Sequence, residues 1–374
     1  MEYIAQDFLS NKTVRVVVAA ESIQSVSPVP NQETDLWLTP GFCDLQVNGG
    51  FGLDLNAKVV TVEQVIQLNQ RLLQHGVTAW CPTVITAESR QMLHCLAVID
   101  EACRTDPLVA SCVAGIHLEG PFLSPVEGAR GAHALDFLRQ PDPAAFAEFQ
   151  QAAGGRIAIL TIAPELNGAL DLIETLSSQG ILVGLGHTMA NRGQIAEAIQ
   201  AGAGFATHLG NGLPAQVHRH DNPFIHLLAQ DDLFASVIFD GHHLPPAIRK
   251  LILRTKTLDR LMMVSDATRL TGLPAGSYEE PIGGMVELSA DGRLSLAGTP
   301  YLAGAAMTLL EDVNAMGSTN TFSLTELLQL SMKNPRDFLG FRQESQVLIQ
   351  FDAQPKQMKV IFAAINDSMI FHKE

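Results

Sequence analysis

The 374-residue sequence predicts an α/β protein, a (β/α)8 TIM barrel with a small β-sandwich domain built from both chain termini. Three observations support this fold class. From Phe42 onward, short apolar runs alternate with amphipathic segments, and eight such runs fit into about 225 residues, the size of one barrel. The two chain ends have strand character of their own, which places a separate small β unit beside the barrel.

Composition and charge limit the function classes. Hydrophobic residues make up 47% of the chain and charged residues 17%, a composition that excludes intrinsic disorder. The 24 basic and 39 acidic residues give a net charge of −15, which argues against a nucleic acid or an anionic membrane as partner. The same charge would repel an anionic small substrate unless positive groups are concentrated in its pocket.

Cysteine usage and the N-terminal sequence indicate the compartment. The five cysteines (43, 81, 95, 103 and 112) are odd in number and form no Cys-x-x-Cys pair, so we expect reduced, buried thiols. The first residues lack the basic and apolar regions of a secretory signal, and no apolar run reaches the roughly 18 residues of a membrane helix. We therefore expect a soluble, cytoplasmic protein.

The small domain is predicted from residues 1–40 and 341–374, and the barrel from residues 41–340. Two strands of the small domain are predicted near the N-terminus, a β-branched run at Val14–Ala19 and a run at Leu36–Thr39 that leads into the Pro40-Gly41 turn signal. Two more are predicted in the tail, at Val347–Phe351 and Met358–Ile365.

The barrel strands are predicted from eight short apolar runs: Phe42–Val47, Val77–Cys81, Val113–Leu118, Ile157–Ile162, Ile181–Leu185, Phe205–Thr207, Ala235–Phe239 and Leu261–Val264. Apolar residues recur at intervals of three and four in Val62–His75 and Ile195–Ala201, so these segments are predicted helices. A Gly-rich hairpin is expected at Gly276–Leu296, followed by helices at Ala305–Met316 and Ser323–Asn334.

Three of the predicted strands end in residues that bind metals. Glu119, His187 and His208 follow the third, fifth and sixth strands, and the carboxyl ends of barrel strands open onto one face. A single histidine near a strand end is more often structural. Because one carboxylate and two imidazoles occur at three strand ends together, we interpret them as a catalytic metal site with a coordination position left for water.

The seventh and eighth strands supply candidates for proton transfer. Asp266 follows the eighth strand, where a carboxylate beside an activated water can act as general base and later as general acid. The alternative for Asp266 is a structural cap. His243 follows the seventh strand and could donate to a substrate carbonyl, whereas its neighbour His242 is the weaker candidate.

Eight segments in order resemble the motifs of the N-acetylglucosamine-6-phosphate deacetylases, a family of the amidohydrolase superfamily. They run from about Leu38 to Gly340 and read LTPGFCDLQVNGG, GVTAWCPT, GIHLEGPFL, GHT, THLGNG, DGHHL, VSDAT and YLAGAAM. The resemblance implies a metal-bearing (β/α)8 barrel with a small β domain built from both termini.

The resemblance also implies a role for each matched residue. It makes Glu119, His187 and His208 the metal ligands, Asp266 the catalytic acid and base, and His243 a substrate contact that polarises the acetamide carbonyl. The remaining implied substrate contacts are Asn211 and Gly212 for the phosphate segment, Arg219 contributed across a homodimer interface, and the loop Leu302, Ala303 and Gly304.

The first strand bears on the number of metals. Many amidohydrolases carry His-x-His at its end, but this chain has Gln46 and Asn48, neutral amides that bind transition metals poorly. We therefore expect one divalent ion per subunit, Zn²⁺ or Fe²⁺, and a dinuclear site is the minority alternative. The amides themselves are expected in the substrate pocket.

Departures from the family pattern lie in the substrate pocket. Glycines stand at 210 and 212, where the family carries a bulkier residue and alanine, and His218 and His220 flank Arg219. Three alternatives to the deacetylation of N-acetylglucosamine 6-phosphate stay open. They are a deacetylase of a related N-acyl amino sugar, such as the galactosamine epimer or an unphosphorylated sugar, a non-catalytic sugar-phosphate-binding homologue, and a cyclic-amide hydrolase or deaminase.

Overall fold

Eight parallel strands form the barrel in the computed structural model, which describes residues 1–372 except 20–21, 281–283, 300–301, 320 and 355. The strands are hydrogen-bonded in the order β5-β8-β9-β10-β11-β12-β13-β14. Their bounds are β5 (Phe42–Val47), β8 (Val77–Ile85), β9 (Ile116–Glu119), β10 (Ile157–Ile162), β11 (Leu182–Leu185), β12 (Ala203–Ala206), β13 (Phe234–Val237) and β14 (Leu261–Met263). All eight predicted strands are therefore confirmed, with ends that shift by up to four residues.

The first and last barrel strands close the sheet through a short contact rather than a full ladder. A single parallel bridge joins Val47 to Ala267 just beyond β14, and the Asp44 carboxylate accepts the backbone N–H of Ser265 at 3.1 Å. This seam places the ends of β5 and β14 side by side.

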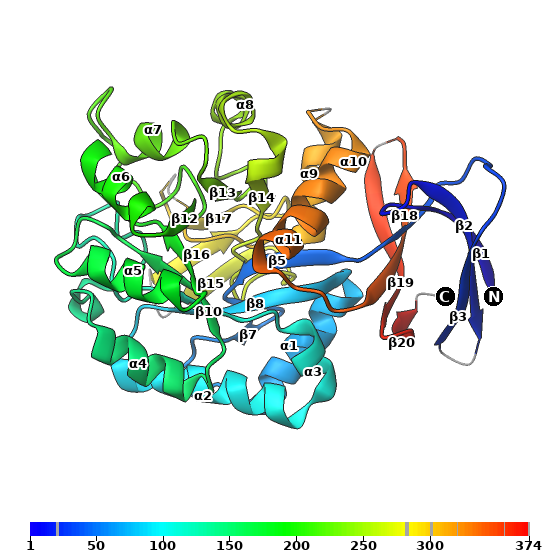
Figure 1. Cartoon of the computed structure of the whole chain (residues 1–374), viewed down its shortest axis with the longest axis horizontal. Helices are drawn as coiled ribbons and strands as arrows, with labels where there is room; N and C mark the ends of the chain where they lie inside the picture. The colour runs from blue at the N-terminus through cyan, green and yellow to red at the C-terminus, as the bar shows by residue number, and fades with distance from the viewer. Residues whose placement is uncertain (20–21, 281–283, 300–301, 320, 355, 373–374) are drawn as a thin grey trace.

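Helices surround the barrel strands (Figure 1). They are α1 (Val62–Gln74), α2 (Ser89–Thr105), α3 (Pro107–Cys112), α4 (Pro143–Ala152), α5 (Ala169–Ser178), α6 (Arg192–Gln200), α7 (Pro223–Leu228), α8 (Pro246–Thr255), α9 (Leu309–Ser318), α10 (Leu324–Leu328) and α11 (Asn334–Leu339), with a π-helical turn at Gln329–Lys333. The helix predicted from Ala305 begins at Leu309 instead, because Thr308 and Glu311 form a capping box at that point. No helix in the described part of the chain is long and apolar enough to cross a lipid bilayer.

Both chain ends build the small β domain, seen at the right of Figure 1. Its strands are β1 (Glu2–Asp7), β2 (Lys12–Ala19), β3 (Ser22–Pro28), β4 (Leu36–Thr39), β18 (Ser345–Asp352), β19 (Gln357–Ile365) and β20 (Ser368–His372). The predicted two-layer sandwich takes the form of one curled sheet, closed where β1 pairs with β4. Its interior is filled by apolar side chains such as Val16, Leu348 and Phe362.

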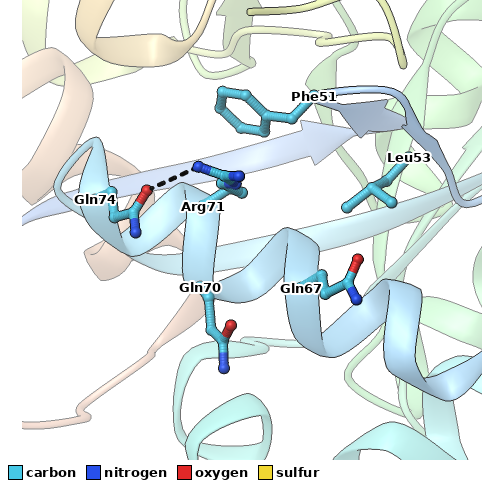
Figure 2. A pocket seen from close by; sticks show the side chains of 6 residues that line it. All are labelled: Phe51, Leu53, Gln67, Gln70, Arg71 and Gln74. Atoms are coloured by element: carbon cyan, nitrogen blue, oxygen red, sulfur yellow. Dashed lines mark hydrogen bonds between the residues drawn. The ribbon is translucent and has the colours of Figure 1, made fainter.

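Two smaller sheets decorate the barrel. The expected hairpin is a three-stranded antiparallel sheet of β15 (Gly276–Glu280), β16 (Gly284–Leu288) and β17 (Leu294–Leu296), and residues 281–283 within it lie outside the described residues. The short pair β6 (Gly49–Gly50) and β7 (Leu53–Asp54) follows β5. Phe51 and Leu53 from this segment, together with three glutamines and Arg71 of α1, line a surface hollow of about 340 Å³ (Figure 2).

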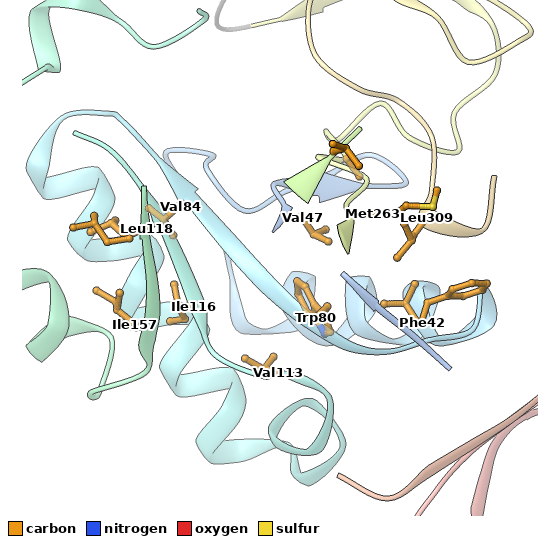
Figure 3. Packing of buried hydrophobic residues seen from close by; sticks show 14 of the residues in the cluster. Phe42, Val47, Trp80, Val84, Val113, Ile116, Leu118, Ile157, Met263 and Leu309 are labelled. Carbon is orange, nitrogen blue, oxygen red and sulfur yellow. The ribbon is translucent and has the colours of Figure 1, made fainter. Parts of the chain in front are cut away.

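Side chains alternate between the two faces of each barrel strand. On β9, Ile116 and Leu118 belong to the core between the strands and the helices, as Figure 3 shows, so His117 and Glu119 face the barrel interior. A second apolar cluster inside the barrel includes Ile159 of β10 and Phe205 of β12. The alternation thus delivers Glu119 to the inside of the barrel at the carboxyl end of its strand.

Candidate active site

Three of the predicted site residues have strained backbone conformations directly after barrel strands. The φ angles of His187, His208 and Asp266 are +50°, +32° and +50°, in the left-handed region that residues other than glycine rarely adopt. Each residue follows its strand, β11, β12 or β14, by two or three positions. Strain of this kind persists only where surrounding structure holds it, and it concentrates at functional sites.

Glu119 is the centre of the site. Its Oε1 atom lies 2.9 Å from His208 Nε2 and 3.4 Å from His187 Nε2, and it accepts a 3.1 Å hydrogen bond from Gln46 Nε2. Burial alone would raise the pKa of this carboxyl, but the hydrogen bonds from the two imidazoles hold it well below its ordinary value. For His208 the opposite holds: burial would lower its pKa, but the hydrogen bond and charge of Glu119 raise it.

His187 is fixed on several sides. Its Nδ1 donates to the Ala129 carbonyl at 2.8 Å, which leaves Nε2 facing Glu119. A Cβ added at Gly212 would lie 2.8 Å from His187 Nδ1, and one at Gly131 would lie 3.0 Å from its Cε1. Both glycines also have positive φ, so the close approach of two loops to this ring requires glycine at both places.

His133 belongs to the site although its sequence position gives no signal. The residue lies in the loop after β9, is 5% exposed, and places Nε2 3.9 Å from Glu119 Oε2. Within the described residues, Glu119, His133 and His187 have ligand atoms within 4.8 Å of one another. His133 Nδ1 contacts the Thr86 hydroxyl at 2.9 Å, and burial lowers its pKa to about 3, so this imidazole is neutral.

Asp266 is held by the other amide of the first strand. Asn48 Nδ2 donates to Asp266 Oδ1 at 2.7 Å, and the backbone N–H of Asn48 donates to the Ala267 carbonyl at 2.8 Å. Burial raises the pKa of Asp266 to about 6, and the negative charge of Glu119 adds to the rise. A carboxylate with that pKa can take and return a proton near neutral pH.

The two amides therefore act as hydrogen-bond donors to the two carboxylates. Gln46 donates to Glu119 and Asn48 donates to Asp266. Their carbonyl oxygens, Gln46 Oε1 and Asn48 Oδ1, are buried and have no hydrogen-bond partner within the described structure. Neither amide replaces the ligands that a His-x-His pair would bring to a second metal.

His243 has a partner that the sequence did not reveal. Asp240 Oδ2 lies 2.6 Å from His243 Nδ1, and Asp240 Oδ1 accepts the backbone N–H groups of His242 and His243. Burial would raise the pKa of Asp240, but its hydrogen bonds with His243 lower it, so the carboxylate is ionised. Because Nδ1 of His243 is engaged, Nε2 is the nitrogen that can reach a substrate. His242 instead contacts the Asp291 carbonyl, so the two neighbouring rings have different partners.

The expected phosphate segment is divided between the site and the surface. Asn211 donates to the His208 carbonyl through its backbone N–H at 3.0 Å and its side chain at 3.2 Å. Arg219 lies in an exposed loop, and its guanidinium makes no hydrogen bond or ion pair with any residue that the structure describes. Within one subunit, therefore, the structure brings Asn211 and Gly212 to the site and leaves Arg219 on the surface.

The loop of Leu302, Ala303 and Gly304 lies beside the segment that carries Asp266. Thr268 donates to the Ala305 carbonyl through both its backbone and its hydroxyl, and a Cβ on Gly304 would lie 2.9 Å from the Thr268 methyl group. Tyr301, at the start of this motif, lies outside the described residues.

The surface hollow beside α1 is not the site. The hollow of Figure 2 lies against α1 and includes none of the predicted site residues. A much smaller hollow, about 10 Å³, lies between the ends of β11 and β12 and is lined by His187, Thr207, Asn211 and the glycines 210 and 212 among others. A Cβ on Gly210 would meet Leu244 at 2.9 Å, so Leu244 packs into the space where a larger residue at 210 would lie.

The donor set fits a divalent metal. Imidazole and carboxylate ligands suit Zn²⁺ and Fe²⁺, and His187 Nδ1 is bound to a backbone carbonyl in the manner of metal-ligating histidines. Glu119, His187 and His208 could supply the three ligands, with His133 as the competing third candidate. The five cysteines are all buried and free, as expected, and none lies in this cluster.

Comparisons with known proteins point to one family. No family model matches the chain. The N-acetylglucosamine-6-phosphate deacetylase of Bacillus subtilis (strain 168) is 32% identical over 323 residues, which cover 85% of this chain and 80% of that protein. The crystal structure of N-acetylglucosamine-6-phosphate deacetylase from Pasteurella multocida covers all of both chains with a TM-score of 0.83 and 25% identity. The structure of a mutant Mycobacterium smegmatis N-acetyl-D-glucosamine-6-phosphate deacetylase in complex with N-acetyl-D-glucosamine-6-phosphate has a TM-score of 0.80 and 26% identity. The match covers 96% of this chain and 94% of that one.

Proposed function

The chain belongs to the N-acetylglucosamine-6-phosphate deacetylase family, and we propose that it hydrolyses the acetamide of N-acetylglucosamine 6-phosphate to glucosamine 6-phosphate and acetate. The observation that carries the proposal is the convergence of His187 and His208 on Glu119 in a barrel that also holds Asp266. These groups are the parts that amide hydrolysis requires: ligands for a Lewis acid and a base for water.

Glu119, His187 and His208 would hold one divalent metal ion. When bound, such an ion makes water more acidic and polarises a carbonyl oxygen. Support for a single ion comes from Gln46 and Asn48, because neutral amides are poor transition-metal ligands and stand where a His-x-His pair would bind a second ion. We propose Zn²⁺ or Fe²⁺ as the ion, since both accept two imidazoles and a carboxylate.

Asp266 transfers the proton, and His243 orients the substrate carbonyl. Asp266 takes the proton of the attacking water and returns it to the nitrogen of the departing amino sugar. Asn48 fixes Oδ1 of this carboxylate, which leaves Oδ2 to face the water. His243 donates from Nε2 to the carbonyl oxygen while Asp240 holds its Nδ1.

The substrate's sugar and phosphate would contact the remaining residues. Gln46, Asn48, Asn211 and Gly212 border the ligand cluster, and Leu302, Ala303 and Gly304 border Asp266 on its other side. We propose that Arg219 reaches the phosphate in the neighbouring subunit of a homodimer. Its exposure within one subunit and that of Val217, 40% exposed beside it, support this arrangement.

The setting of the enzyme is also a proposal. We place it in the cytoplasm, in amino-sugar catabolism, and the five free, buried cysteines support a reducing compartment. The domain boundaries are proposed to fall after residues 40 and 340. Element bounds support them, because β4 ends at Thr39 and β5 begins at Phe42, while α11 ends at Leu339 and β18 begins at Ser345.

A substrate panel tests the proposal. Acetate release by the purified protein would be measured with N-acetylglucosamine 6-phosphate, its galactosamine epimer and both unphosphorylated sugars. We expect the highest kcat/KM for N-acetylglucosamine 6-phosphate. In Arg219→Ala, the KM for this phosphorylated sugar should rise towards the KM for the unphosphorylated sugar. Equal kcat/KM for the unphosphorylated sugar would refute the phosphorylated substrate, and no acetate from any sugar would refute the deacetylase.

A further inference from the structure

A chain of buried hydrogen bonds crosses the barrel interior directly beneath the site. His117 Nδ1 contacts the Leu45 carbonyl at 3.0 Å, His117 Nε2 contacts Thr161 Oγ1 at 2.7 Å, and Thr161 Oγ1 contacts Thr207 Oγ1 at 2.8 Å. The three side chains are 1%, 0% and 3% exposed. We call His117, Thr161 and Thr207 the interior polar chain.

The geometry determines which atom is the donor in each hydrogen bond of the interior polar chain. A carbonyl only accepts, so His117 Nδ1 carries the hydrogen that it donates to Leu45. No carboxylate lies within hydrogen-bond reach of His117 among the described residues, so the buried ring is neutral and Nε2 is an acceptor. Thr161 must therefore donate to His117, and Thr207 must donate to Thr161.

Two glycines allow the threonines to meet. Thr161 is on β10 and Thr207 follows β12, and β11 lies between those strands. A Cβ on Gly184 would lie 2.5 Å from Thr207 Oγ1, and one on Gly186 would lie 2.9 Å from both Thr161 Cγ2 and Thr207 Cβ. The hydroxyls touch only because Gly184 in β11 and Gly186 just after it carry no side chain.

Each link of the chain adjoins a residue of the proposed metal site. Leu45 precedes Gln46, His117 lies two residues before Glu119, and Thr207 precedes His208. Thr161 is the register partner of Glu119 in the β9–β10 ladder. The interior polar chain thus ties the four strands β5, β9, β10 and β12 together one layer below the ligand cluster.

We propose that the interior polar chain is a positioning element that sets the spacing of Glu119 and His208 for metal binding. This inference rests on the proposed function, because it takes these residues as ligands. Metal sites tolerate displacements of only a few tenths of an ångström. Losing a link would leave buried acceptors and donors unpaired and let the strands shift.

Thr161→Val tests the inference, because it keeps the shape of the side chain and removes both hydrogen bonds of the central link. The protein would be stripped of metal and titrated with Zn²⁺ against a chromophoric chelator, and kcat and KM would be measured on the loaded enzyme. We expect the metal affinity to fall by about 10- to 100-fold, as for other groups that orient ligands indirectly. The loss in turnover should appear in kcat, and Thr161→Ser, which restores the hydroxyl, should recover the affinity.

Thr78→Val is the matched control for a merely structural effect. Thr78 is also a buried threonine with a bonded hydroxyl, which donates to the Pro40 carbonyl at 2.7 Å, but it lies at the start of β8, far from the strand ends that carry the site. The Thr78→Val substitution should lower the melting temperature and leave the metal affinity unchanged.

Two results would overturn the inference. One is a Thr161→Val protein that loses thermal stability as Thr78→Val does yet binds Zn²⁺ like the wild type. The other is a weakened affinity that Thr161→Ser does not recover. A wild-type protein that binds metal but releases no acetate would refute the proposed function alone, since the titration would still measure the positioning effect.

Discussion

The two ends of the barrel interior use the same strands and opposite kinds of side chain. Ile159 on β10 and Phe205 on β12 belong to the apolar cluster inside the barrel. Two residues further along, Thr161 and Thr207 are hydrogen-bonded to each other beneath Glu119. At the apolar end, buried hydrophobic surface stabilises the fold and depends little on exact geometry. At the polar end, strained residues and buried charges lower the free energy of unfolding. Changes at the two ends should therefore have separable effects.

The largest effect is expected at the ligand cluster. His208→Asn should remove the metal and nearly all activity, because it deletes one of three proposed ligands. His133→Asn should retain the metal, although both histidines lie near Glu119. Metal content by elemental analysis, with acetate release, measures both. If His133→Asn loses the metal and His208→Asn keeps it, the third ligand is His133.

Asp240 should have the next largest effect, because it acts through His243. Asp240→Asn replaces the carboxylate that holds His243 Nδ1, so we expect kcat to fall by about 10- to 100-fold with metal content unchanged. Asp291→Asn is the control, since Asp291 contacts the adjacent His242 through its backbone carbonyl. Equal losses in the two variants would show that charge near this loop matters and that orientation of His243 does not.

At the apolar end, substitution should cost stability and leave chemistry intact. Phe205→Ala removes a ring that is 1% exposed and packs edge-on against Phe338 at 5.3 Å between ring centroids. We expect a loss of about 3–5 kcal/mol in the free energy of unfolding. Denaturant unfolding measures the loss, and metal affinity should stay at the wild-type level. A parallel loss of metal affinity would mean that the two ends are coupled.

The last effect concerns the pH dependence of stability. Burial raises the pKa of Asp44, at the seam between β5 and β14, from 3.8 to about 7. Between about pH 4 and pH 7 the folded chain therefore holds a proton that the unfolded chain has lost, and stability falls as pH rises through that window. The measurement is the urea midpoint of chelator-treated protein as a function of pH. In Asp44→Asn the midpoint should fall less steeply between about pH 4 and pH 7 than in the wild type. An unchanged slope would assign the pH dependence to other groups.

The sequence was sufficient to predict the barrel and to propose the residues that gather at the carboxyl ends of its strands. Short apolar runs separated by amphipathic segments located all eight barrel strands, and Phe42–Val47 and Ile157–Ile162 match to the residue. Glu119, His187 and His208 could be found because each follows such a run directly or after one residue, and parallel strands gather their ends at one face. The predicted roles of these residues stay predictions, supported by the distances that join them.

Other parts of the site carried no local signal. His133 lies in a loop far from any strand end, and Asp240 looks like an ordinary turn residue, so only the folded chain shows that they contact Glu119 and His243. The same is true of Thr161 and Thr207, whose contact depends on Gly184 in β11 and Gly186 just after it. The curled closure of the small sheet was also missed, because it depends on pairing between β1 and β4 rather than on any one strand.

Asp266→Asn provides the most direct test of the central claim, that the polar end of the barrel is a metal-dependent hydrolase with Asp266 as its base. The substitution keeps the side-chain shape and removes the proton acceptor, while Glu119, His187 and His208 are untouched. We expect wild-type metal content and a loss of kcat for N-acetylglucosamine 6-phosphate of about 10³-fold or more, since general base catalysis and water activation are both impaired. Acetate release near the wild-type rate in a metal-loaded Asp266→Asn protein would contradict it.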